Sequence, residues 1–125
     1  MLTHFILYVK DQGASTRFYE RVLDQEPTLN VPGMTEFSLS ETSVLGLMPE
    51  SGIKQLLGEP LPDPSNARGI PRAEIYLVVN DASRYLGRAL QNGATLLSEL
   101  TLRNWGQKVG YCLDLDSHVL AFAEQ

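Results

Sequence analysis

The sequence lacks several features that would point to particular classes of protein. Its 125 residues include a single cysteine, Cys112, which excludes an intrachain disulfide and favours a reducing compartment, so we expect a cytoplasmic protein. Lysine and arginine form no run, and the formal net charge is −5. Nucleic acid and anionic membranes are therefore not expected as partners.

Long hydrophobic runs are also missing. Apolar stretches such as residues 75–79 are far shorter than the roughly 20 residues that span a bilayer. The first ten residues have neither the basic start nor the small-residue cleavage site of a signal peptide. A hydrophobic fraction of 43% and a charged fraction of 20% are ordinary for a globular protein, and the length suits one compact domain.

One pattern occurs twice in the chain. Residues 4–11, His-Phe-Ile-Leu-Tyr-Val-Lys-Asp, return as residues 74–81, Glu-Ile-Tyr-Leu-Val-Val-Asn-Asp. Each copy predicts a strand that ends at an aspartate, Asp11 or Asp81, placed to cap a following helix. Apolar residues at helical spacing then predict helices over residues 14–23 and 82–90, the second ending at Asn92-Gly93.

Three short strands are predicted after each helix, separated by turn residues. They cover residues 28–31, 36–40 and 44–48 in the first copy, and residues 95–100, 108–113 and 118–123 in the second. Each copy therefore reads βαβββ. The sequence predicts one domain over residues 1–125, made of a module at 1–50, a proline-rich linker at 51–71 with at most one helical turn near residues 53–57, and a module at 72–125.

A module of this size with one helix cannot bury both faces of its own sheet. We therefore predict an α+β fold in which two βαβββ modules pair into a curved mixed sheet that encloses a cleft, with the helices outside. Alternation along the strands places Phe5, Leu7 and Val9 under the first helix. The residues expected to face the cleft are His4, Ile6, Tyr8, Val44, Gly46, Met48, Glu74, Tyr76, Val78, Val119, Ala121 and Ala123.

The arrangement resembles the vicinal oxygen chelate superfamily, which includes glyoxalase I, the bleomycin and fosfomycin resistance proteins and the extradiol dioxygenases. Residues 4–11, the helix with Phe18-Tyr19, and the ending from Trp105-Gly106 through residues 111–122 carry the resemblance. Ser117 stands where the family's closing hairpin usually has a glycine. The resemblance covers nearly the whole chain and implies a homodimer with its site at or near the subunit interface.

In metal-dependent members of that superfamily, the ligands come from the first and last strands of each module. Carried over by position, the resemblance assigns His4, Gly46, Glu74 and Ala121. Glycine and alanine have no ligating side chain, whereas a catalytic divalent metal usually has about three protein ligands. No cofactor is therefore expected, although a metal at His4 and Glu74 stays open if other donors complete it. The donors considered are Glu36, Glu124, His118 and Cys112, of which His118 reads as a hairpin residue and Cys112 as a buried apolar one.

His4 and Glu74 are also the candidate catalytic residues. An inward carboxylate is costly to bury unpaired, so Glu74 should meet a cation, a hydrogen-bond donor or water. The simplest hypothesis pairs it with His4, either to bind a polar ligand or transfer a proton, or as a structural polar contact.

An apolar wall is the second functional feature predicted for the cleft. Trp105, Tyr8, Tyr76, Phe37 and Met48 are predicted to line it and to suit an organic ligand, with Arg103 as an anchor for an anionic group. The predicted function is a small-molecule-binding protein of the glyoxalase and bleomycin resistance type without a complete metal site. The alternatives are a metal-dependent lyase or isomerase of glyoxalase type that uses His4 and Glu74, and a dimerising scaffold with a vestigial cleft. No motif identifies the ligand.

Overall fold

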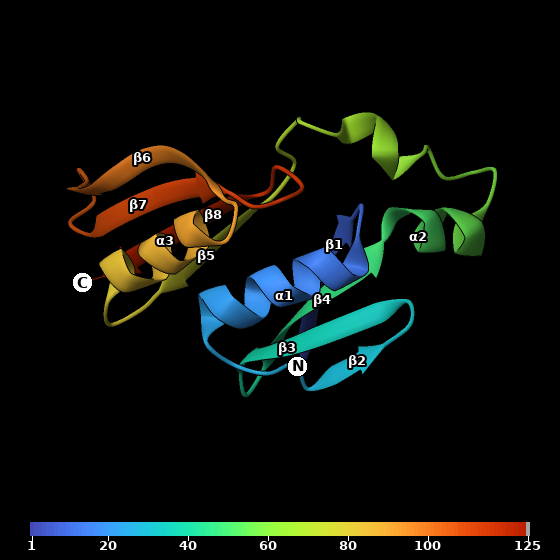
Figure 1. The fold of residues 1–125 in the computed structure, drawn as a ribbon, viewed down its shortest axis with the longest axis horizontal. Helices are drawn as coiled ribbons and strands as arrows, with labels where there is room; N and C mark the ends of the chain where they lie inside the picture. The colour runs from blue at the N-terminus through green and yellow to red at the C-terminus, as the bar shows by residue number, and fades with distance from the viewer. Residues whose placement is uncertain (125) are drawn as a thin grey trace. The chain divides into compact units, whose positions relative to one another are not determined.

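A computed structural model describes residues 1–124, which form two compact units (Figure 1). The first unit comprises residues 1–20 and 24–66, and the second comprises residues 21–23 and the chain from residue 67 onward. Each unit contains a four-stranded mixed sheet with an accompanying helix, so the predicted α+β class with two βαβββ modules is confirmed. No helix among the described residues is both long and apolar enough to cross a membrane.

The sheet of the first unit has the strand order β1-β4-β3-β2, in which β1 is parallel to β4 and the other pairs are antiparallel. Helix α1 begins after Asp11, whose carboxylate accepts a hydrogen bond from the Ala14 backbone N–H at 3.0 Å, as an N-cap does. The elements are β1 (Thr3–Val9), α1 (Gln12–Leu23), β2 (Leu29–Val31), β3 (Met34–Ser40) and β4 (Ser43–Pro49).

One row of side chains across this sheet shows where the core lies. Phe5, Leu45 and Phe37 pair in register on β1, β4 and β3 and therefore share a face. Leu45 and Phe37 are buried, and the Phe37 ring contacts Tyr19 of α1, but Phe5 on the edge strand is 63% exposed. The prediction that Phe5 packs under the helix is wrong, whereas Leu7 and Val9, on the same strand and the same face, are buried as predicted. Burial on this face of β1 begins at Leu7, so Phe5, near the start of the strand, lies outside the core.

The second unit repeats this topology with the order β5-β8-β7-β6, in which β5 is parallel to β8. Helix α3 lies on β7 and β8 (Figure 1), and its Tyr85 ring packs 5.8 Å from Phe122 of β8. Asp81 caps α3 as predicted, and Gly93 after its C-terminus has the positive φ of 107° that glycine tolerates. The elements are β5 (Glu74–Val78), α3 (Ala82–Gln91), β6 (Thr95–Leu102), β7 (Lys108–Leu113) and β8 (Val119–Glu124).

The segment predicted as a linker contains more structure than one helical turn. Helix α2 (Glu50–Leu57) has eight residues, and a short 3-10 helix follows at Pro64–Ala67. Ile53 of α2 is 8% exposed, and the helix contacts β4 and β1 of the first unit. The sequence analysis underestimated this helix because the prolines around it indicate only where a helix would end. The helix is stabilised by burial of Ile53, a tertiary contact that the local sequence does not show.

Candidate functional site

Two tyrosines stand side by side on the sheet of the second unit. Tyr76 of β5 and Tyr111 of β7 both pair in register with Ala121 of β8, so they flank this alanine on one face. The face is the one opposite α3, since the next residue of β8, Phe122, contacts the helix. Tyr111 packs over a buried floor formed by Val109, Ala121 and Ala123.

Trp105 extends this aromatic surface from the turn between β6 and β7. The turn is closed by a backbone hydrogen bond from the Arg103 N–H to the Gln107 carbonyl at 2.8 Å, and Gly106 takes a φ of 92° within it. The indole N–H of Trp105 donates to the Tyr76 hydroxyl at 3.0 Å, and that hydroxyl donates to the Gln107 side-chain carbonyl. Trp105 and Tyr76 are thereby fixed relative to each other while remaining 54% and 37% exposed.

The Arg103 side chain forms hydrogen bonds to both strands that flank the same turn. Its Nε and Nη2 groups donate to the Val109 carbonyl at 3.1 and 2.8 Å, and Nη2 also donates to Ser98 Oγ and the Glu99 carbonyl. The guanidinium lies 5.2 Å from the centre of the Tyr111 ring, within the range of a cation–π contact. These contacts are structural, so the predicted role of Arg103 as an anion anchor gains no support from its Nε and Nη2 groups.

Glu74 supplies a negative charge beside the tyrosines. Burial raises the pKa of the Tyr111 hydroxyl, the charges of Glu74 and Tyr76 raise it further, and Arg103 lowers it. Tyr111 therefore stays protonated, as a hydrogen-bond donor. The Glu74 carboxylate is exposed and, within the described part of the chain, makes no hydrogen bond or ion pair of its own.

His4 meets a carboxylate of its own unit. Its Nδ1 lies 3.3 Å from Oε2 of Glu36, and because β4 separates β1 from β3, the two side chains approach each other across β4. Sequence reasoning considered Glu36 as a donor but did not pair it with His4. The alternation of side chains along β3 could have indicated this pair. It puts Glu36 on the face opposite to that of Phe37, and His4 lies on the same face as Glu36.

Position 46, one of the four positions that the superfamily pattern assigns to a metal ligand, is filled by neighbouring side chains. A Cβ atom on Gly46 would lie 3.1 Å from Ile6 Cγ1 and 3.3 Å from Met34 Sδ, tighter than ordinary contacts. His4 and Glu36 form a pair only, and nowhere in residues 1–124 do three histidine, cysteine, aspartate or glutamate side chains gather closely enough to hold a metal ion. The residues of the individual units therefore do not fit the metal site of that superfamily.

The other donors considered from the sequence have structural roles. Cys112 is fully buried, and burial together with the charge of Asp114 raises the pKa of its thiol to about 12. His118 Nδ1 lies 2.9 Å from the Asp114 carboxylate in the hairpin between β7 and β8, in agreement with its predicted hairpin role. The Glu124 carboxylate accepts a hydrogen bond from the Ala82 N–H at 2.9 Å, at the start of α3.

The residues of the predicted apolar wall belong to both units. Tyr76 and Trp105 lie together in the second unit, and Tyr8 and Met48 are paired neighbours on β1 and β4 of the first. Phe37 is fully buried against Tyr19, so its assignment to the wall is wrong. The physical reason is strand alternation, which places Phe37 on the helix side together with Leu45.

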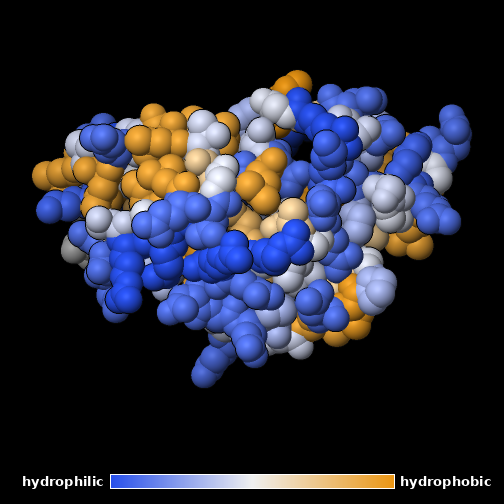
Figure 2. All heavy atoms as spheres, in the orientation of Figure 1, coloured by the Kyte–Doolittle hydropathy of each residue, from blue (hydrophilic) through white to orange (hydrophobic). Residues whose placement is uncertain are grey.

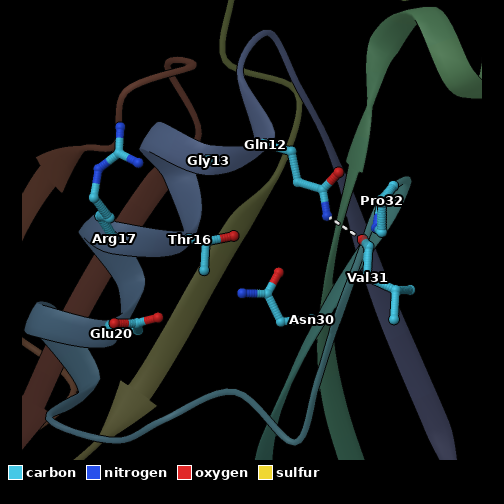
Figure 3. A pocket seen from close by; sticks show the side chains of 8 residues that line it. All are labelled: Gln12, Gly13, Thr16, Arg17, Glu20, Asn30, Val31 and Pro32. Atoms are coloured by element: carbon cyan, nitrogen blue, oxygen red, sulfur yellow. Dashed lines mark hydrogen bonds between the residues drawn. The ribbon is translucent and has the colours of Figure 1, made fainter.

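A pocket of about 420 Å³ lies elsewhere in the first unit, between α1 and β2 (Figure 3). Gln12 donates to the Val31 carbonyl at 2.8 Å and to the Thr35 hydroxyl at 3.0 Å, and the buried Thr16 and Thr35 hydroxyls lie 2.8 Å apart. Because these inner polar groups bond to one another, they bind α1 to the sheet rather than presenting free groups to a ligand. The lining residues are Gln12, Gly13, Thr16, Arg17, Glu20, Asn30, Val31 and Pro32.

Hydrophobic side chains also gather on the surface of the second unit, over β6 and β7 (Figure 2). On β6, Leu97 is 50% exposed and Leu102 is 65% exposed. This strand lies at the edge of its sheet, and its pairing with β7 shifts register twice. Such irregularities limit the pairing of an edge strand with other chains.

Comparisons with known proteins agree with this architecture. The sequence profile of a family described as a glyoxalase-like domain matches residues 2–125. A glyoxalase-related enzyme from Fulvimarina pelagi has a similar structure, with a TM-score of 0.81 and 20% identity over 100% of this chain and 88% of that one. A glyoxalase/bleomycin resistance protein/dioxygenase family enzyme from Burkholderia phytofirmans gives a TM-score of 0.78 and 17% identity over 97% of this chain and 95% of that one.

A third similar structure is a glyoxalase / bleomycin resistance protein from Catenulispora acidiphila. It has a TM-score of 0.69 and 21% identity over 100% of this chain and 98% of that one. At these identities the similarity establishes a shared fold. No curated protein sequence matches the chain.

Proposed function

The chain belongs to the glyoxalase-like domain family, and we propose that it binds a small organic molecule without a complete catalytic metal site. The observation that carries the proposal is the group formed by Trp105, Tyr76 and Gln107 on the exposed face of the second sheet. The group presents an indole and a phenol that are fixed in position yet open to solvent.

Fixed aromatic rings are suited to binding. A ligand ring placed on them gains buried apolar area and about 0.5–1.5 kcal/mol of additional aromatic interaction, without first having to order the side chains. The Gln107 amide and the Glu74 carboxylate add the few polar groups that orient a ligand in an apolar site. Specific binding by this surface is therefore physically reasonable.

NMR tests this proposal directly. The chain has one tryptophan, so an ¹⁵N-labelled sample gives one indole N–H signal, which belongs to Trp105. Titration with indole, quinoline and benzyl alcohol should move this signal and the backbone amides of Tyr76 and Gln107. If all three compounds leave these signals in place at millimolar concentration, or move only signals from other parts of the chain, the proposal is wrong.

A homodimer in the cytoplasm completes the proposal. Large apolar side chains are exposed on an edge strand of each sheet, Phe5 on β1 and Val78 on β5, and such surfaces favour association. The buried thiol of Cys112 suits a reducing compartment. Sedimentation equilibrium should give twice the monomer mass of 13.9 kDa, and a monomer at high micromolar concentration would argue against the dimer.

A metal-dependent lyase or isomerase of glyoxalase type is the second candidate. It is favoured by the 3.3 Å approach of His4 to Glu36, since a histidine beside a carboxylate can transfer a proton or provide part of a metal site. Elemental analysis of protein purified without a histidine tag, together with an assay on methylglyoxal and glutathione, tests this alternative. Stoichiometric metal and activity, both lost in His4→Ala, would replace the first proposal with the second.

A further inference from the structure

The exposed face of the second sheet has an unequal distribution of charge. Tyr76, Tyr111 and the neighbouring strand residues on this face are aromatic, aliphatic or small, and Glu74 is the charged residue among them. Lys108 belongs to the opposite face, because it is an odd number of residues away from Tyr111 along β7. Arg103 is the nearby cation, and its Nε and Nη2 are held by the Val109, Glu99 and Ser98 oxygens.

The aromatic residues are arranged around this acid. Tyr76 lies two residues along β5 from Glu74 and therefore on the same face. The charge of Glu74 also raises the pKa of Tyr111 on β7. The two tyrosine backbones are about 10 Å apart, the width of two strand spacings, with only the small Ala121 between them. A ligand on this face would therefore contact phenol rings and a carboxylate together.

The face already contains one cation–π contact. The Arg103 guanidinium lies 5.2 Å from the Tyr111 ring centre, so the electron-rich face of that ring interacts with a positive charge in this protein. Tyr76 and Trp105 are more exposed, and no arginine or lysine is found over either ring among the described residues. Their ring faces remain open to a cation from outside the protein.

We propose that this face selects an organic cation, namely an amine in its ammonium form or a quaternary ammonium compound. The Glu74 carboxylate attracts the positive charge, and Tyr76 and Trp105 contact the methyl or aryl groups attached to the nitrogen. The inference rests on the proposed ligand-binding function of the same surface and specifies its ligand class. The acidic chain, with a net charge of −5, adds a weak general attraction for cations.

Three probes of similar size test the charge preference: benzyltrimethylammonium, benzyl alcohol and phenylacetate. Binding to the full chain is followed by the fluorescence of Trp105, the single tryptophan. We expect benzyltrimethylammonium to bind most tightly and phenylacetate most weakly. In Glu74→Gln, the affinity for the cation should fall about fivefold, as expected for unit charges about 4 Å apart in a water-like dielectric, while the affinity for benzyl alcohol stays unchanged.

Glu20→Gln is the matched control. Glu20 belongs to the first unit and lines its pocket, so this variant makes the same change in charge at a residue that is not part of the aromatic face, and it should bind the cation like the wild type. Raising the salt concentration should weaken binding of the cation but not of benzyl alcohol. Glu74 is exposed, Glu20 is half-buried, and glutamine has nearly the same size as glutamate, so both variants should fold, which near-UV circular dichroism verifies.

The outcomes separate this inference from the function on which it rests. Equal affinity for all three probes, or wild-type affinity of Glu74→Gln for the cation, overturns the cation preference and leaves small-molecule binding intact. Preferential binding of phenylacetate also overturns the preference and returns Arg103 to the role of anion anchor. If none of the probes changes Trp105 fluorescence and the NMR titration is also silent, both the preference and the binding function are wrong.

Discussion

Replacing Phe37 by alanine separates the core of the first unit from its exposed surface. Phe37 is fully buried between α1 and the sheet, where its ring centre lies 6.4 Å from that of Tyr19 and its register partner is Leu45. Its removal would leave a cavity whose walls, α1 and the sheet, cannot close fully. Substitutions of this kind cost about 3–5 kcal/mol in free energy of unfolding.

Phe5→Ala provides the matched comparison. Phe5 lies in the same row of side chains as Phe37, but it is 63% exposed on the edge strand. The same substitution should therefore cost less than about 1 kcal/mol, because surface changes rarely exceed that value. The contrast is informative because the sequence analysis assigned Phe5 to the core and Phe37 to a ligand wall.

Urea unfolding of both variants, followed by circular dichroism, measures the two values under identical conditions. We expect the urea midpoint to fall strongly for Phe37→Ala and slightly for Phe5→Ala, with similar m-values. Equal losses, or a larger loss for Phe5→Ala, would show that the packing of α1 on the first sheet has been described incorrectly.

Three other predictions follow from single residues. The Cys112 thiol has a pKa of about 12 in the folded protein against an ordinary value of 9.0, so its contribution to stability is complete below pH 9 and is lost as the pH rises towards 12. Unfolding at pH 8 and pH 10 should show a larger loss in the wild type than in Cys112→Ala, by at most about 1.4 kcal/mol per pH unit, and equal losses would contradict the raised pKa. Ser117 has a left-handed φ of 68°, so Ser117→Gly should raise the free energy of unfolding by up to about 1 kcal/mol, and a lower urea midpoint would refute the strain argument. Tyr76→Phe removes the hydroxyl between Trp105 and Gln107, so hydrogen exchange of the Trp105 indole N–H should accelerate, and an unchanged rate would show that this bond does not hold the indole.

Much of the fold follows from local patterns in the sequence. The repeated strand, the capping residues Asp11 and Asp81 and the glycine at position 93 all lie where their chemistry predicts. These signals need only neighbouring residues. Helix α2 was underestimated because its stability depends on packing against β4, which a local pattern does not contain.

The candidate site was less predictable. Phe37 was predicted to line the cleft, but its pairing with Leu45 places it on the face that packs on the helix, and a single strand read alone does not show this pairing. The bond from Trp105 to Tyr76 joins a turn to a strand 29 residues away, and the contact of His4 with Glu36 spans three strands, so neither has a local signal. The position of Tyr111 could have been predicted. Cys112 is buried, so its neighbour Tyr111 in β7 must face the opposite side of the sheet.

The most direct test of the central claim is to locate a bound ligand on the protein. Intermolecular nuclear Overhauser effects between benzyltrimethylammonium and isotope-labelled protein report which side chains the probe touches. The account predicts contacts from the probe to the Trp105 and Tyr76 rings. Contacts confined to Thr16 and Val31, in the pocket of the first unit, would contradict it.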